Sequence, residues 1–280
     1  MAGACRNLIY DVGMHRGEDA EFYLKKGYDV VGFEADPRLI AHCKERFKDV
    51  IATGRMRLVE GAIAPSHFGN EVTFFQNQKE TVWGTIDPAR AALNARLGGD
   101  SDVIAVSRVD ISEAFGGFGI PYYLKVDIER ADKYVLEGLC TTEDRPQYIS
   151  IESDKDNISA VEAELRLLQE LGYSKFKAVQ QQSIPGTTIA TKALDGHEFL
   201  HTFPRSASGP FGDDIPQPWL TAEAVLHDYR SIFHRYRLFG DDSPLLKAPR
   251  HVRLGAEVLH KLRTGYEGPL PGWYDTHAAL

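Results

Sequence analysis

The sequence predicts an α/β fold: a doubly wound, mainly parallel sheet followed by a C-terminal extension. Early in the chain, short apolar runs alternate with helical patterns, which is typical of a parallel sheet covered on both faces. One of these runs turns through Gly13 and Gly17 into a helical stretch, as in nucleotide-binding sheets. From about Gln180 on, proline, glycine and polar residues dominate. We therefore divide the chain into a core domain, 1–180, and an extension, 181–280, packed on it as a lid, a recognition appendage or a plain structural addition.

Composition and charge exclude several classes of protein. A chain of 280 residues can bury a substantial core. Its formal net charge of −8 argues against binding to a nucleic-acid backbone, which needs clustered Lys and Arg. No apolar run is long enough to span a bilayer, and the N-terminus lacks a signal-peptide core. The three cysteines have no metal-type spacing. We expect a cytoplasmic protein with reduced thiols and neither a nucleic-acid nor a membrane partner, and a homodimer stays open.

The expected strands are short apolar or alternating runs. Six of them would form the sheet, and the alternating run at 71–76 would be an extra strand. In chain order they cover 8–11, 30–33, 57–60, 71–76, 122–127, 148–152 and 173–179.

The expected helices lie between and after these runs. Pro37 suits the first turn of its helix, in which Leu39, Ile40 and Cys43 share one face. A later helix stops at Gly172, a residue typical of helix ends. The helices cover 19–26, 37–47, 131–139, 159–171 and 221–239.

The turn after the first strand, together with the acid after the second, predicts a nucleotide-type pocket. Gly13 lets the backbone turn sharply and approach a ligand. Glu34 follows the second strand, about 20 residues further on, where a carboxylate can accept hydrogen bonds from ribose hydroxyls. Only the spacing Gly-x-x-x-Gly is present, so the strict dinucleotide pattern is absent and the ligand stays open at this point.

Acidic residues follow three of the expected strands. Glu34, Asp127 and the pair Glu152 and Asp154 would gather at one edge of the sheet, where open parallel sheets bind their ligands. A single acid at a strand end is often only a helix cap. Several acids at consecutive strand ends favour a functional site instead.

Five segments then stand out as motifs: Asp11–Glu18, Phe33–Pro37, Trp83–Thr85, Tyr123–Glu129 and Ile149–Glu152. They occur in the order seen in FkbM-family methyltransferases, which the chain resembles over roughly residues 5–180. At the end of the expected strand 122–127, the family pattern usually reads Asp-x-Glu-Gly-x-Glu, whereas this chain has Arg130 for the glycine and Asp132 for the last acid. The departures leave the fold assignment intact but put in doubt any role that needs a bare backbone at position 130.

The resemblance implies a class I, Rossmann-like, S-adenosylmethionine-dependent O-methyltransferase. By position, the glycine turn would lie under the methionine part of the cofactor, Glu34 would bind its ribose, and Ala62 would lie against its adenine. Asp127 would stand where the cofactor meets the acceptor. The positions that the resemblance assigns to cofactor binding are Asp11, Gly13, His15, Gly17, Glu34, Ala35, Ala62 and Asp127.

The implied chemistry is an in-line attack of an alcohol oxygen on the sulfonium methyl group, for which the protein must orient both reactants and remove the hydroxyl proton. Asp127 and Glu129 are the leading candidates for the base, and His15 is a third because it lies in the cofactor loop. Alternatively, Asp127, Glu152 and Asp154 could hold Mg²⁺, which prefers oxygen ligands. The other interpretation is that these acids bind cofactor and backbone without metal.

The acceptor has to be inferred mainly from the second half of the chain. Aromatic faces combined with carboxylates and histidines suit a sugar or glycoside better than a lipid or polyketide alcohol. The segment 272–278 is unusually rich in such groups, so we expect it to fold back near the active site. The candidate acceptor residues are Trp83, Thr85, Glu152, Asp154, Trp219, His234, Trp273 and Tyr274.

Two alternatives from other classes remain. An NAD(P)-dependent oxidoreductase would share the glycine turn and Glu34, and Tyr173 and Lys177 have the Tyr-x-x-x-Lys spacing of short-chain reductases. That chemistry needs the pair on one helix, whereas here it lies on a predicted strand. A catalytically inactive cofactor-binding protein is the second alternative, which Arg130 keeps open.

Overall fold

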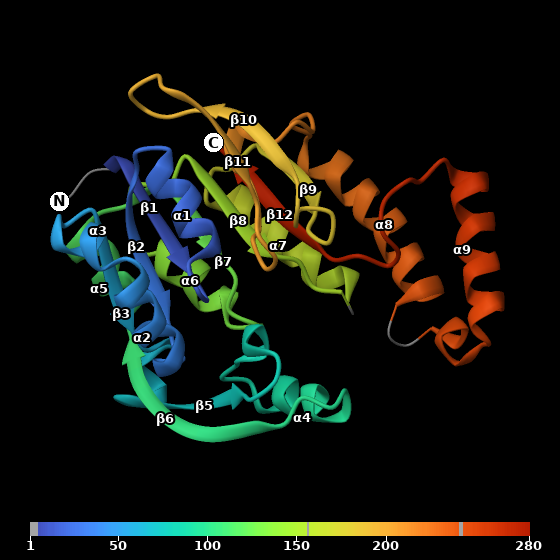
Figure 1. The fold of residues 1–280 in the computed structure, drawn as a ribbon, viewed down its shortest axis with the longest axis horizontal. Coiled ribbons are helices and arrows are strands. Elements are labelled where there is room, and N and C mark those ends of the chain that lie inside the picture. The colour runs from blue at the N-terminus through green and yellow to red at the C-terminus, as the bar shows by residue number, and fades with distance from the viewer. Residues whose placement is uncertain (1–4, 156, 241–242) are drawn as a thin grey trace.

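A seven-stranded sheet forms the centre of the computed structural model, which describes residues 5–155, 157–240 and 243–280 (Figure 1). Its strands are β1 (Cys5–Val12), β2 (Asp29–Glu34), β3 (Met56–Glu60), β7 (Pro121–Val126), β8 (Tyr148–Glu152), β9 (Lys175–Gln180) and β12 (Tyr274–Ala279). They lie in the order β3-β2-β1-β7-β8-β12-β9. Neighbours from β3 to β8 are parallel, whereas β12 is antiparallel to β8 and β9. The predicted doubly wound, mainly parallel sheet is confirmed.

Helices cover both faces of this sheet, which explains why the central strand β1 is apolar on both sides. Leu8, Tyr10 and Val12 pack in one core and Ile9 in the other, because successive side chains of a strand point to opposite faces. The first core packs against α5 (Ile111–Phe118), α6 (Asp132–Leu139) and α7 (Ile158–Glu170), and the second against α1 (Glu18–Lys25) and α2 (Pro37–Arg46), which α3 (Lys48–Ala52) follows.

A smaller sheet of three strands stands at one edge of the main sheet, in the lower part of Figure 1. The sequence predicts its strand β5 but not β6, although β6 contains the apolar run 103–106, and most side chains of β6 are exposed or only partly buried. The elements of this region are β4 (Ala62–Ile63), η1 (Ser66–Phe68), β5 (Glu71–Asn77), η2 (Thr81–Trp83), α4 (Pro88–Arg96) and β6 (Ser101–Val109).

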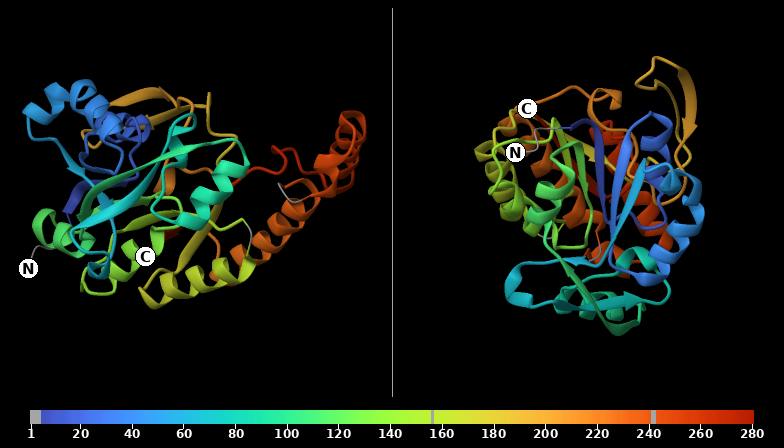
Figure 2. Two further views of the ribbon diagram at one scale, coloured as in Figure 1. Left: turned by 90° about the horizontal axis from the view of Figure 1, so that it is seen from below. Right: turned by 90° about the vertical axis from the view of Figure 1, so that its left-hand side faces the viewer.

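The extension consists of a hairpin and two long helices. Figure 2, left, shows α8 and α9 reaching away from the body of the molecule. Within the described residues, no helix combines the length and apolar character needed to cross a membrane. The elements are β10 (Thr188–Lys192), β11 (Glu198–Thr202), η3 (Gly212–Asp214), α8 (Ala222–Phe239), η4 (Pro244–Lys247) and α9 (Arg250–Thr264).

The strand β12 changes the expected division of the chain at residue 180. It inserts between β8 and β9, with Asp275 opposite Glu152 and Thr276 opposite Ala178. The central sheet is therefore completed by residues that the sequence assigns to the extension. The expectation that segment 272–278 folds back near the site is confirmed, since Trp273 and Asp275 line the cavity described next.

Candidate active site

A cavity of about 1030 Å³ lies at the carboxyl ends of β1, β2, β7 and β8. One half is formed by the turn after β1, the end of β2 and the strand β4. The other half is formed by the segment 79–86 around η2 and by residues of the extension, among them Gln181, Arg205 and Trp273. Strand ends and extension together enclose the site, as expected for the carboxyl edge of an open parallel sheet.

The turn after β1 needs glycine at two positions. Gly13 and Gly17 have φ angles of 79° and 78°, in the left-handed region that glycine adopts without penalty. A Cβ on Gly13 would stand 1.9 Å from the Asp127 carbonyl oxygen, and one on Gly17 would stand 2.4 Å from the Phe47 ring. Gly13 faces the cavity, whereas Gly17 supports the turn from behind.

The Glu34 carboxylate is fixed at the end of β2 by two backbone donors. The amides of His15 and Asp36 each donate to one of its oxygens at 2.9 Å. Burial raises the pKa of Glu34 to about 7, although these two hydrogen bonds oppose the shift. Each oxygen keeps a lone pair for a further donor, as a ribose-binding carboxylate requires. Ala35 and Ala62 line the cavity beside it.

His15 ties the turn to the opposite wall. Its Nδ1 lies 3.0 Å from Glu18 Oε1, and its Nε2 lies 2.7 Å from Thr81 Oγ1 in η2. The Glu18 pKa is lowered: burial would raise it, but the contacts with His15 and backbone amides outweigh burial. With both ring nitrogens engaged, His15 is placed as a structural link between the two halves of the cavity.

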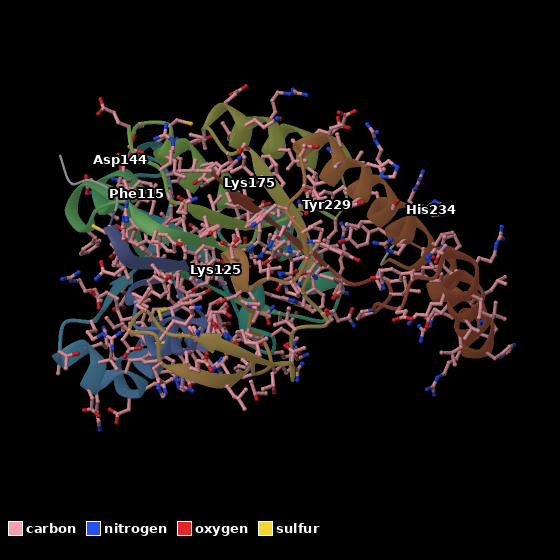
Figure 3. All side chains as sticks on the ribbon, turned by 90° about the horizontal axis from the view of Figure 1, so that it is seen from above. Phe115, Lys125, Asp144, Lys175, Tyr229 and His234 are labelled. Carbon is pink, nitrogen blue, oxygen red and sulfur yellow. The ribbon has the colours of Figure 1, made fainter. Side chains whose placement is uncertain are left out.

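A buried lysine organises the acids at the centre of the sheet. Lys125 Nζ lies 3.3 Å from Asp11, 3.8 Å from Asp19 and 3.6 Å from Asp127, measured to a carboxylate oxygen. Figure 3 shows Lys125 in the middle of the molecule. Burial alone would lower the pKa of Lys125, but the three carboxylates hold it well above its usual value. Asp11 lies behind the turn and supports it through this lysine.

Among the acids that follow β7 and β8 and line the cavity, Asp127 has the most exposed side chain. Its side chain is 40% exposed, against 13% for Glu129 and 19% for Glu152. Glu129 is engaged in an ion pair with Arg90 at 2.9 Å. Burial raises the pKa of Asp127, as do Glu152 and Asp11, against the opposing effect of Lys125. A carboxylate that is open, and whose pKa is raised, is suited to accept a proton.

Comparison with known proteins identifies the family. The methyltransferase FkbM domain matches residues 11–175, which is more than half of the chain. The chain belongs to the FkbM methyltransferase family. A search of curated protein sequences finds no match.

Solved structures of methyltransferases are similar to the chain at low identity. FkbM from Methylobacillus flagellatus is 16% identical over 64% of this chain and 41% of its own, with a TM-score of 0.40. A SAM-dependent methyltransferase from Archaeoglobus fulgidus is 14% identical over 99% of this chain and 86% of its own, with a TM-score of 0.37. Precorrin-6y C5,15-methyltransferase from Geobacter metallireducens is 12% identical over 71% of this chain and 76% of its own, with a TM-score of 0.35.

The FkbM-family cavity does not support the proposed Mg²⁺ site. Among the residues that the structure describes, no group of three or more His, Cys, Asp or Glu side chains could hold a metal ion. Asp127 is drawn to Lys125, Glu152 is paired with Lys155 at 3.0 Å, and Asp154 accepts a hydrogen bond from the Asn157 amide. Asp127 and Glu152 are thus each paired with a lysine, and Asp154 lies at the start of α7.

Half of the predicted acceptor residues line the cavity described above. Trp83, Thr85, Glu152 and Trp273 line it. They come from the segment after β5, the end of β8 and the approach to β12, so both halves of the chain contribute.

The other four predicted acceptor residues lie outside it. Asp154 lies at the start of α7, as above. Trp219 stacks on Tyr148 with ring centroids 5.9 Å apart, under Lys177, and covers the outer surface near β9. Tyr274 contacts Arg235 and Tyr266, because it points to the opposite side of β12 from Asp275. His234 is exposed on α8, away from Lys125 (Figure 3).

The reductase-like pair is not a site. Tyr173 donates to the Pro146 carbonyl, and Lys177, on β9, donates to the carbonyls of Gly212 and Ile215. Neither residue lines the cavity. The interpretation that the spacing is accidental agrees with these contacts.

Sequence reasoning missed several residues of the FkbM-family cavity. Lys125 and Arg90 form ion pairs with residues far away in the sequence, and such pairs cannot be predicted from the spacing of neighbouring residues. Arg205 and Ser208 come from a loop held over α1, where the Asp19 carboxylate accepts hydrogen bonds from the Ser208 and Gly209 amides at 2.9 and 3.2 Å. In the sequence, only the abundance of proline and glycine in that loop indicated that it differs from the core.

Proposed function

We propose that the chain is an S-adenosylmethionine-dependent O-methyltransferase whose acceptor is a hydroxyl of a sugar or glycoside. The observation that carries the proposal is one continuous cavity of about 1030 Å³ that joins the glycine turn and Glu34 to a second, aromatic and acidic half. Small-ligand pockets commonly measure about 300–1,000 Å³, so this cavity has room for a cofactor and an acceptor together.

The cofactor half of the cavity fits S-adenosylmethionine. Gly13 lets the turn pack directly on the Asp127 backbone at the cavity wall, Glu34 can accept from both ribose hydroxyls, and Ala62 offers a small apolar wall to the adenine. When bound, S-adenosylmethionine supplies a methyl group on a positively charged sulfur, and the acidic lining favours that charge.

Asp127 is the base that we propose. It stands between the cofactor turn and the acceptor half, since its own carbonyl lies against Gly13 and its carboxylate is open to the cavity. In methyl transfer the Asp127 carboxylate would accept the proton of the acceptor hydroxyl, while bound S-adenosylmethionine would supply the methyl group. Lys125 keeps this side chain in place, and Glu129 positions Arg90 at the acceptor side.

The acceptor half favours a sugar. Trp83 and Trp273 bring flat aromatic faces to the cavity, which suit the C–H faces of a pyranose ring. Glu152 and Gln181 add hydrogen-bonding groups for hydroxyls. A lipid or polyketide alcohol would offer these groups no hydrogen bonds beyond those that Lys155 and the Val179 carbonyl already provide.

Calorimetric titration of the purified chain with S-adenosylmethionine, S-adenosylhomocysteine and NADH tests the cofactor, and transfer of labelled methyl groups to a panel of free sugars, glycosides and long-chain alcohols tests the acceptor. We expect micromolar binding of the first two ligands and label in a glycoside. Binding of NADH alone would sink the proposal, and label only in apolar alcohols would reassign the acceptor.

A further inference from the structure

The helix α9 presents an apolar face to solvent. None of its residues is buried. Leu254, Val258 and Leu262 follow one another at four-residue intervals and therefore form a stripe along one side. Its exposed large apolar side chains are Val252 (43%), Leu254 (46%), Val258 (57%), Leu259 (56%) and Leu262 (79%).

The polar side of α9, not the apolar one, faces the rest of the protein. The His260 ring packs edge-on against Phe239 at the end of α8, with ring centroids 5.2 Å apart. Ala256, Glu257 and His260, on this side, are only partly exposed. A surface helix normally turns its apolar stripe toward the core. In α9 the large apolar side chains are exposed instead, so its apolar stripe is left for a partner. Figures 1 and 2 show that α9 lies at the far end of the molecule, beyond α8.

Cations border the apolar stripe on both sides. At about 100° per residue, Arg263 lies at one edge of the stripe, and Arg250 and Lys261 lie at the other. With Arg253 the helix carries four Arg and Lys residues against the single acid Glu257, in a chain whose formal net charge is −8. An apolar stripe flanked by cations is complementary to an anionic lipid surface, with acyl chains under the stripe and phosphates beside the cations.

A second copy of the chain fits this face less well. Two α9 helices packed stripe to stripe would bring the bordering cations Arg250, Lys261 and Arg263 of both copies together. Each copy could offset them only with Glu257, which already lies 3.9 Å from Arg253. The other exposed large apolar side chains of the described residues lie on separate elements and form no stripe to receive α9: Phe68, Val82, Leu97, Val103, Leu194, Leu200 and Trp273.

We propose that α9 docks on the surface of a membrane that contains anionic lipid, lying in the plane of the interface. Fifteen residues give a helix about 22 Å long, shorter than the roughly 30 Å hydrocarbon core, so α9 lies on the membrane and does not span it. The expectation of no membrane partner rested on the absence of an apolar run long enough to span a bilayer. An amphipathic helix that lies on the membrane surface needs no such run.

Co-sedimentation with lipid vesicles tests the proposal on the full chain. The probes are vesicles of phosphatidylcholine alone and of phosphatidylcholine with an equal part of phosphatidylglycerol. The test variant is Val258→Glu with Leu262→Glu, and the matched control is Val103→Glu with Leu200→Glu, which places the same two charges at an exposed valine of β6 (65%) and an exposed leucine of β11 (73%). Circular dichroism and S-adenosylmethionine titration check that each variant is folded.

We expect the wild type and the control to partition onto anionic vesicles, the α9 variant to bind at least tenfold more weakly, and added salt to weaken binding. Equal binding of the α9 variant and the wild type would overturn the proposal, as would no binding of the wild type. Light scattering that shows a dimer, lost in the α9 variant, without vesicle binding would assign the face to a second copy. These readouts do not depend on methyl transfer.

Discussion

Asp127 and Glu129 look interchangeable in the sequence motif, but their surroundings separate them. We predict that Asp127→Asn lowers kcat by about 10²–10⁴-fold while the dissociation constant for S-adenosylmethionine changes only a few-fold, because the open carboxylate takes the proton. Glu129→Gln frees Arg90 from its ion pair and should act mainly on the KM of the acceptor. Steady-state kinetics with calorimetry separate the two effects. An Asn variant that loses cofactor binding and kcat alike would make Asp127 a binding residue.

Glu34 should make cofactor affinity depend on pH. Burial raises its pKa to about 7, and ribose hydroxyls donate best to the ionised form. As pH falls below about 7, the free protein takes up a proton that must leave on binding, so affinity should fall by up to tenfold per pH unit and level off above pH 7. Titrations between pH 5.5 and 8 measure this. In Glu34→Gln the affinity should be lower at pH 8 and lose this slope.

Arg130 occupies a backbone conformation that suits glycine. Its φ is 73°, and the preceding Glu129 has φ 46°. A side chain in the left-handed region costs roughly 1–2 kcal/mol, so Arg130→Gly should raise the free energy of unfolding by about 1 kcal/mol. Denaturant titration of the two proteins measures the difference. A lower stability of the glycine variant would show that contacts of the arginine side chain outweigh the backbone.

Among the residues of the candidate site, those at strand ends could be predicted from the sequence, whereas the ion pairs could not. Gly13, Glu34 and Asp127 stand out because each is tied to a strand end, and a strand end can be read from an apolar run. Lys125 lies in the middle of such a run, and its three carboxylate partners come from different elements. Nothing local in the sequence reports such a cluster.

The turn between β1 and α1 should tolerate no side chain at its first glycine. In Gly13→Ala the new Cβ would meet the backbone oxygen of Asp127, which cannot move without disturbing β7. We predict at least tenfold weaker S-adenosylmethionine binding and a loss of about 1–3 kcal/mol of stability. Gly116→Ala is the matched control, because a Cβ there meets nothing within 4 Å and α5 should gain about 0.5–1 kcal/mol. Calorimetry and thermal unfolding report both values.

Every predicted strand and helix is present to within a few residues, but several elements were missed, among them β6 and α9, which carry apolar residues, and β12, which carries few. The predicted runs 122–127 and 148–152 match β7 and β8 closely. By contrast, β12 is buried throughout, yet its sequence is largely polar. Thr276, for example, is satisfied by Tyr229 at 2.7 Å and by Ser153 at 2.8 Å. A strand whose buried groups are paired with other polar groups carries no hydrophobic signature.

Buried acids should make the whole protein less stable as pH rises above neutral. Burial raises the pKa of Asp132 to about 7 and that of Glu164 to about 8, so the folded state holds protons that the unfolded chain has already released. A raised acid pKa means stability that is lost as pH climbs toward that value. We predict a falling free energy of unfolding between pH 6.5 and 8, measured by urea titration.

Substitution within α7 isolates one of these acids. Glu164→Gln should make the free energy of unfolding fall less steeply with pH, by about 1 kcal/mol per pH unit, because one buried carboxyl no longer ionises. Glu170→Gln, at an exposed position of the same helix, should leave the slope unchanged. A flat profile for the wild type would contradict the assignment.

The placement of β12 also sets an order of events in folding. Its pairing partner β8 lies more than one hundred residues earlier in the chain, and β9 can join the sheet only through β12. During synthesis, strands β1 to β8 can assemble while β9, the hairpin and both long helices wait. The wall of the cavity that holds Trp273 and Asp275 arrives with β12. A nascent chain halted before this strand would therefore have its glycine turn in place but lack one wall of the cavity, so we expect no methyl transfer until β12 has been added.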